Sequence, residues 1–226
     1  MSDLIVQAAA NPIIRWEYFI DEWDQIQAAL IEHLELTVYA VALGLVVSAG
    51  LAAIALRYRW TAGPINGFTA FLYTIPSVAL FGILVPYFGL SRITAVLPLA
   101  AYTLLILVTN IVAGFNAVSP EVREAADGMG MTARRRILHV ELPLALPYII
   151  TGLRITVVST VGLVTVAAII GQGGLGRLIL DGLQRTFWTP MVVGAVLSVI
   201  LALALDLLIY VAGVAATPWA RRARTR

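Results

Sequence analysis

The chain has 226 residues, of which 60% are hydrophobic and 12% charged, and its formal net charge is +2. The mean hydropathy of +0.91 and the long uncharged runs exclude a water-soluble globular protein and indicate a membrane protein. There is no cysteine, which excludes disulfide and thiol chemistry.

The first 35 residues are polar and acidic compared with the rest of the chain. The opening MSDLIVQAAANP has an acid and no early basic residue, so it does not resemble a cleaved signal peptide. From Trp16 onward, aromatic and aliphatic residues recur near helical spacing among carboxylates. We predict that residues 1–35 form an extracytoplasmic amphipathic segment, which lies either on the membrane surface or against the helix bundle.

Five apolar runs follow, and each is long enough to cross a bilayer, which takes about 20 residues. Backbone groups in lipid must bond within their own segment, so the spans are predicted to be helices. The chain is therefore predicted to be an all-α membrane protein, with a transmembrane region at 36–216 and a basic cytoplasmic tail at 217–226. The runs are Leu36–Leu56, Trp60–Phe88, Ile93–Phe115, Leu144–Ile170 and Met191–Ala215.

The arginines predict the orientation, because basic residues are enriched on the cytoplasmic side. If the C-terminus is cytoplasmic, ten arginines lie inside and four outside, with Arg154 in or near the fourth span. An odd number of spans then places the N-terminus outside and the C-terminus inside. Residues 117–143 become a cytoplasmic loop.

Charge is concentrated in this loop, in the stretch EAADGMGMTARRRILHVELP from Glu124 to Pro143. Ser119-Pro120 is typical of a helix start, and Gly130 of a helix end. Thr132 can cap a second short helix that carries three arginines. Pro143 and Pro147 are predicted to turn the chain back into the membrane. The expected result is a helix–turn–helix across the cytoplasmic face; the alternative is a charged loop that only satisfies the positive-inside rule.

This stretch resembles the signature loop of permease subunits of bacterial ABC importers. The family pattern is E-A-A, three residues, G, nine residues, I, one residue, L-P, and this chain matches the spacing throughout, with Val140 in place of Ile. In that family the loop forms the coupling helices that dock into the ATPase subunit. The resemblance therefore implies an ATPase-coupling role for Glu124, Ala125, Ala126, Gly130, Arg134, Leu142 and Pro143.

The resemblance extends from Leu30 to Trp219 and is greatest to the glycine betaine, carnitine and choline importer branch. It implies the five-helix type I permease core shared with methionine importers, in the bacterial cytoplasmic membrane. The implied partners are a separate ATPase that holds ATP and Mg, a second permease chain, identical or related, an extracytoplasmic solute-binding protein, and membrane lipid. The chain itself is expected to bind no cofactor, metal or nucleic acid.

Other functions remain open at this stage. Methionine or another small solute is an alternative substrate within the family. An ATP-independent channel or secondary carrier is an alternative of another class, although the matched loop argues against it. A membrane enzyme is disfavoured because no catalytic constellation is visible.

The motif GQGGLG, Gly171 to Gly176, satisfies the pattern G-x-G-x-x-G. A nucleotide-binding interpretation fails, because an apolar span precedes it and no Gly-Lys-Ser/Thr follows. We predict an outer-face turn between spans four and five. Its backbone could approach a binding protein or substrate, or it could be a plain turn. The candidates for a binding-protein contact or outer gate are Gly171, Gly173, Gly174 and Gly176.

Two further groups of residues stand out within the spans. The candidates for the transport pathway are aromatic, polar or kink-forming: Tyr73, Pro76, Ser77, Phe81 and Asn110. Arg154 and Asp206 are charges about 13 and 15 Å deep from the predicted cytoplasmic ends of their spans. Charges at such depth are costly unless paired. We predict that the two side chains face each other; the alternative is that both reach water at the interface.

Overall fold

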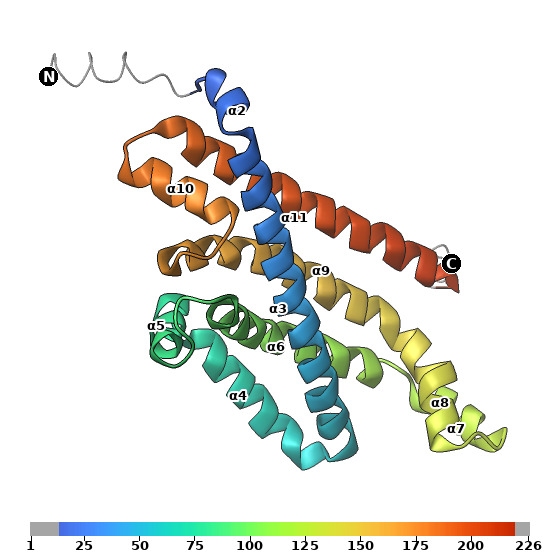
Figure 1. The fold of residues 1–226 in the computed structure, drawn as a ribbon. Helices are drawn as coiled ribbons and strands as arrows, with labels where there is room; N and C mark the ends of the chain where they lie inside the picture. The colour runs from blue at the N-terminus through green and yellow to red at the C-terminus, as the bar shows by residue number, and fades with distance from the viewer. Residues whose placement is uncertain (1–13, 220–226) are drawn as a thin grey trace, which may run out of the picture. The chain divides into compact units, whose positions relative to one another are not determined.

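The computed structural model describes residues 14–219, and every regular element within that range is helical (Figure 1). The elements η1 and η3 are 3₁₀ turns, and η2 is a π turn. In chain order they are α2 (Glu17–Asp21), α3 (Trp23–Arg57), η1 (Arg59–Thr61), α4 (Ala62–Thr74), α5 (Ser77–Phe88), α6 (Arg92–Asn116), α7 (Pro120–Gly128), α8 (Ala133–Arg136), η2 (Ile137–Glu141), α9 (Leu142–Val166), η3 (Ala167–Ile170), α10 (Leu175–Gln184) and α11 (Trp188–Ala216).

Four helical stretches between residues 14 and 219 are long and apolar enough to cross a membrane. They are Trp23–Arg57, Arg92–Asn116, Ala133–Ile170 and Trp188–Ala216. A fifth span is obtained only if Arg59–Thr74 and Ser77–Phe88 are counted together as one broken span. The break falls at Pro76, which lacks an N–H and disfavours helical backbone at the residue before it. The all-helical membrane-type fold is confirmed, and the count of five stays a prediction.

The first long helix begins at Trp23, well before the expected start at Leu36. Neither glycine nor proline lies between these positions, so nothing stops the helix. Ile26 and Ala29 are buried in a cluster with residues of α10 and α11. Residues 23–35 therefore pack against other helices, whereas residues 1–13 of the predicted N-terminal segment lie outside the described range.

Two compact units divide the chain. The first contains the described part of Met1–Val41, with Ile75–Ala100 and Ser159–Ala204. Its core includes Leu36, Phe81, Leu99 and Val164. The second contains Ala42–Thr74, Ala101–Val158 and the described part of Leu205–Arg226. Its core includes Ala52, Leu107 and Ile111.

The predicted turn at Pro143 and Pro147 is wrong. From Ala133 to Val166 the chain stays helical, through α8, η2 and α9, with Pro147 inside α9. The N–H of Leu142 bonds to the carbonyl of Ile137, five residues back, immediately before Pro143. Because Pro143 has no N–H to give, a widened π turn at this point lets the helix pass the missing donor.

α10 is not predicted from the sequence; it begins at Leu175, within the glycine motif. Gly171, Gly173 and Gly174 all have positive φ, at 74°, 116° and 50°, so the turn requires residues without a Cβ. A Cβ on Gly174 would lie 2.4 Å from the carbonyl oxygen of Ala29. The motif therefore serves close packing of the turn against α3.

Gly176 tests this packing without the complication of positive φ. A Cβ there would lie 2.3 Å from the carbonyl oxygen of Thr165, whereas one on the exposed Gly162 of α9 would meet no atom within 4 Å. We expect Gly176→Ala to destabilise the protein by about 1–3 kcal/mol through overpacking. Gly162→Ala should stabilise it by about 0.5–1 kcal/mol. Thermal unfolding in detergent measures both, and equal effects of the two variants would contradict the packing role.

Candidate functional site

The loop between α6 and α9 begins with a well-capped helix. Ser119 has extended backbone at the N-cap of α7 and Pro120 is at the first helical position, as the sequence predicts. Hydrogen bonds from the backbone N–H of Glu121 and from the Ser119 side chain lower the pKa of the Glu121 carboxyl. The carboxylate thus satisfies one orphan backbone donor, the N–H of Glu121, at the positive end of the helix.

The turn after α7 depends on Gly130. This residue has φ of 77°, its N–H bonds to the carbonyl of Asp127 at 2.9 Å, and the N–H of Met131 bonds to the carbonyl of Ala126 at 3.2 Å. These two bonds make a Schellman motif, in which a left-handed residue closes the helix end. The side chain of Thr132 then accepts a bond from the N–H of Arg135 and caps α8. Figure 1 shows α7 and α8 side by side.

A buried carboxylate joins the two halves of this loop. Glu141 is only 6% exposed, and it accepts a hydrogen bond of 2.8 Å from Nε of Arg136. Its other oxygen lies 3.4 Å from Nε of Arg123, on α7. Arg136 also pairs with Asp127, and Arg123 donates to the carbonyl of Phe115 at 2.7 Å. Glu141 is not predicted as a site residue from the sequence, where its only signal is an acid five positions after Arg136.

The loop between α6 and α9 exposes both charged and apolar side chains. Glu124, Ala125, Arg134 and Arg135 are exposed, and among residues 14–219 neither Glu124 nor Arg134 has an ion-pair partner. Ala126 is buried, and Leu142 and Pro143 are half-buried. Large apolar side chains are exposed beside these charges, at Val122, Met129, Ile137 and Leu138. We use the name loop surface for these exposed residues, which are Val122, Glu124, Ala125, Met129, Arg134, Arg135, Ile137 and Leu138.

The predicted pathway residues are divided between the two units, and each group is described within its own unit. Tyr73 and Asn110 belong to the second unit, where the ring of Tyr73 meets Tyr102 edge-on and Asn110 bonds to the carbonyl of Ile106. Pro76, Ser77 and Phe81 belong to the first unit. Phe81 is 1% exposed and packs in the core of that unit.

Arg154 and Asp206 are brought together. Nε of Arg154 donates to Oδ1 of Asp206 at 2.8 Å, and Nη2 donates to Oδ2 at 2.7 Å. The guanidinium carbon lies 4.9 Å from the centre of the Tyr210 ring. This paired fork is the arrangement that best compensates a charge in the membrane. It joins α9 to α11 within the second unit.

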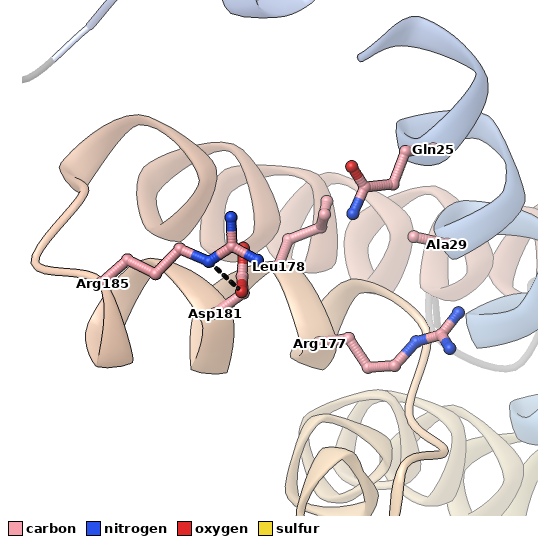
Figure 2. A pocket seen from close by; sticks show the side chains of 6 residues that line it. All are labelled: Gln25, Ala29, Arg177, Leu178, Asp181 and Arg185. Atoms are coloured by element: carbon pink, nitrogen blue, oxygen red, sulfur yellow. Dashed lines mark ion pairs between the residues drawn. The ribbon is translucent and has the colours of Figure 1, made fainter.

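The glycine motif lies beside a shallow hollow in the first unit. Figure 2 shows Gln25 and Ala29 on α3 facing Arg177, Asp181 and Arg185 on α10, with Arg185 paired to Asp181. The hollow has a volume of about 260 Å³.

The hollow is anchored to the glycine turn through Glu32. This carboxylate accepts bonds from the N–H of Gly173 at 3.1 Å and from Arg177 at 2.6 Å. Among the predicted glycines, Gly173, Gly174 and Gly176 are buried and Gly171 is exposed.

Long apolar helices together with a charged segment of short helices are the architecture of a multi-pass membrane protein. Comparison with known families identifies the family to which the chain belongs. Residues 40–213 match the family described as binding-protein-dependent transport system inner membrane component. The chain belongs to this family and is a multi-pass protein of the inner membrane.

Two curated relatives and one solved structure agree with this assignment. The chain is 36% identical over 206 residues to the osmoprotectant import permease protein OsmW of Salmonella typhimurium, covering 89% of this chain and 96% of the relative. It is 34% identical over 187 residues to the glycine betaine/carnitine/choline transport system permease protein OpuCB of Bacillus subtilis, covering 83% and 86%. An inward-facing structure of the MetNI methionine ABC transporter matches with a TM-score of 0.73 at 20% identity, covering 86% of this chain and 97% of that chain.

The role of Gly130 in the turn can be tested by comparing substitutions at Gly130 and Gly128. Gly128 and Gly130 both have open space where a Cβ would stand, but only Gly130 has positive φ. We expect Gly130→Val to loosen the end of α7 by about 1–2 kcal/mol, because a β-branched residue resists the left-handed conformation. Hydrogen exchange of the amides in 120–141 should then accelerate by about tenfold, whereas Gly128→Val should leave it nearly unchanged. Equal exchange in the two variants would show that φ at Gly130 does not hold the turn.

Proposed function

We propose that the chain is the membrane-spanning subunit of an ATP-driven importer for a compatible solute, such as glycine betaine, choline or carnitine. The observation that carries the proposal is the loop surface, which is apolar and charged, exposed, and held rigid by Glu141. A surface of this kind is stable in water when free and complementary to a protein when docked. The identity to osmoprotectant permeases supports the substrate class.

The partner at the loop surface is a separate ATPase, which holds ATP and Mg. The chain itself has no phosphate-binding motif, so the energy for transport comes from outside it. Glu124, Arg134 and the apolar residues around them meet the ATPase, while Ala126, Leu142 and Pro143 shape the loop beneath. ATP-driven movement of the ATPases is transmitted through α7 and α8 to the membrane helices.

The remaining features of the importer are inferred from the resemblance of the chain to permease subunits of bacterial ABC importers. Two permease chains, identical or related, form the pathway, and each has five spans if α4 and α5 share one. The N-terminus lies outside and the C-terminus inside. A solute-binding protein docks on the outer face, and the exposed Gly171 and the hollow beside α10 are the candidate contacts for it. Methionine or another small solute is the alternative substrate.

Uptake into liposomes tests the function. The chain, its ATPase and its binding protein are reconstituted together, and labelled glycine betaine is supplied outside. We expect uptake that requires ATP and stops when the ATPase is omitted. Uptake without the ATPase would instead indicate a channel or secondary carrier. Uptake of labelled methionine but not of betaine would replace the substrate and keep the class.

Accessibility of introduced cysteines tests the topology, and the lack of native cysteine gives a clean background. We expect Gln172→Cys to react with an impermeant thiol reagent from outside and Thr132→Cys only from inside, because one crossing of the membrane by α9 separates the two positions. Each variant is labelled in intact and in opened cells. The reversed pattern would overturn the orientation deduced from the arginines.

A further inference from the structure

The cluster of Arg154, Asp206 and Tyr210 has no part in the loop surface. All three side chains belong to the second unit, on α9 and α11. Arg154 lies about 18 Å along α9 from its first residue, and Asp206 about 15 Å from the last residue of α11, at 1.5 Å per residue. The cluster is therefore within the spans, where ionisable groups are rare and mark functional sites.

The cluster is only partly covered by the chain. The side chains of Arg154 and Asp206 are 35% and 25% exposed, and Tyr210 is 48% exposed. An ion pair that is open to lipid would be costly, so its open side is expected to face a polar species. A purely structural clamp between two helices would gain from being sealed.

The guanidinium of Arg154 has hydrogen-bond donors that Asp206 does not use. Asp206 takes Nε and one N–H of Nη2, which leaves Nη1 with no hydrogen-bond partner among residues 14–219. The pairing holds the guanidinium in a fixed plane, and the Tyr210 ring supports one of its faces. A fixed guanidinium edge with free donors is suited to a carboxylate, which it can bind through two parallel hydrogen bonds.

The same cluster can receive a positive charge. The Asp206 carboxylate and the exposed Tyr210 ring lie beside the guanidinium, and an aromatic face attracts quaternary ammonium groups. The cluster thus combines a carboxylate receptor with a cation receptor at close range. A small molecule with a carboxylate at one end and an ammonium at the other complements both.

We infer that Arg154, Asp206 and Tyr210 form a transient site for a zwitterionic solute on its way through the membrane. Arg154 binds the carboxylate, and Asp206 and Tyr210 receive the ammonium. This inference rests on the proposed transport function. It covers glycine betaine, carnitine and methionine alike, because all three are zwitterions, and it excludes choline, which has no carboxylate.

Replacement of Arg154 by lysine tests the site. Arg154→Lys keeps the charge and the pair with Asp206 but removes the planar fork. The complete transporter is reconstituted, and solute uptake and ATP hydrolysis are measured at saturating loaded binding protein. We expect solute moved per ATP to fall by about tenfold or more, while ATP hydrolysis stays within about twofold of the unmodified protein. A clamp without a ligand would lower uptake and hydrolysis together, and an unchanged ratio of the two would equally overturn the site.

One control variant and one further variant of the site are measured in the same assay. Arg92→Lys makes the same replacement in an exposed ion pair with Glu35 and should leave solute per ATP unchanged. Tyr210→Leu removes the aromatic ring and should lower solute per ATP by several-fold. An unchanged value of solute per ATP in Tyr210→Leu would show that the ring is not part of the site. If the unmodified transporter takes up no compatible solute at all, the proposed function has failed; if it takes up choline but no zwitterion, the function stands and the site is overturned.

Discussion

The loop between α6 and α9 depends on one buried carboxylate. Glu141 receives Arg136 from its own helical stretch and Arg123 from α7, so a single side chain fixes both helices of the loop. A buried charge is favourable only when paired and hydrogen-bonded; Arg136 both pairs with and hydrogen-bonds to Glu141, and Arg123 adds an ion pair at 3.4 Å. Once the three side chains are in place, α7 cannot rotate without leaving a charge uncompensated. The exposed face of the loop therefore has a defined shape before any partner arrives.

Much of this architecture could be deduced from the sequence, because membranes impose severe rules on composition. Long apolar runs predict helices, and Ser119-Pro120, Gly130 and Thr132 predict the helix ends of the loop, since each residue type has a specific conformational role. The pairing of Arg154 with Asp206 is predicted from their similar depth, because an unpaired charge in lipid is costly.

Other features could not be deduced, for equally physical reasons. The start of α3 at Trp23 is invisible to a hydropathy criterion, because a helix continues past the membrane surface when nothing breaks it. Phe81 looked like an aromatic contact for a solute, but its burial is decided by tertiary packing. The pattern G-x-G-x-x-G does not indicate that three of its glycines serve backbone packing against neighbouring helices. Glu141 occupies an unspecified position of the family pattern, so only its contacts reveal its importance.

The π turn at Ile137–Glu141 has a consequence for how α8 and α9 are aligned. A π turn is equivalent to one residue inserted into an α-helix, and each residue of an α-helix advances the side-chain direction by about 100°. Loss of one residue from this turn would convert it to ordinary α-helix and leave the angular phase between α8 and α9 nearly intact. Loss of one residue farther along α9 would rotate Arg134 and Arg135 to another side of the protein. The turn is therefore the place where the length of this helix can change while its two ends keep their facing directions.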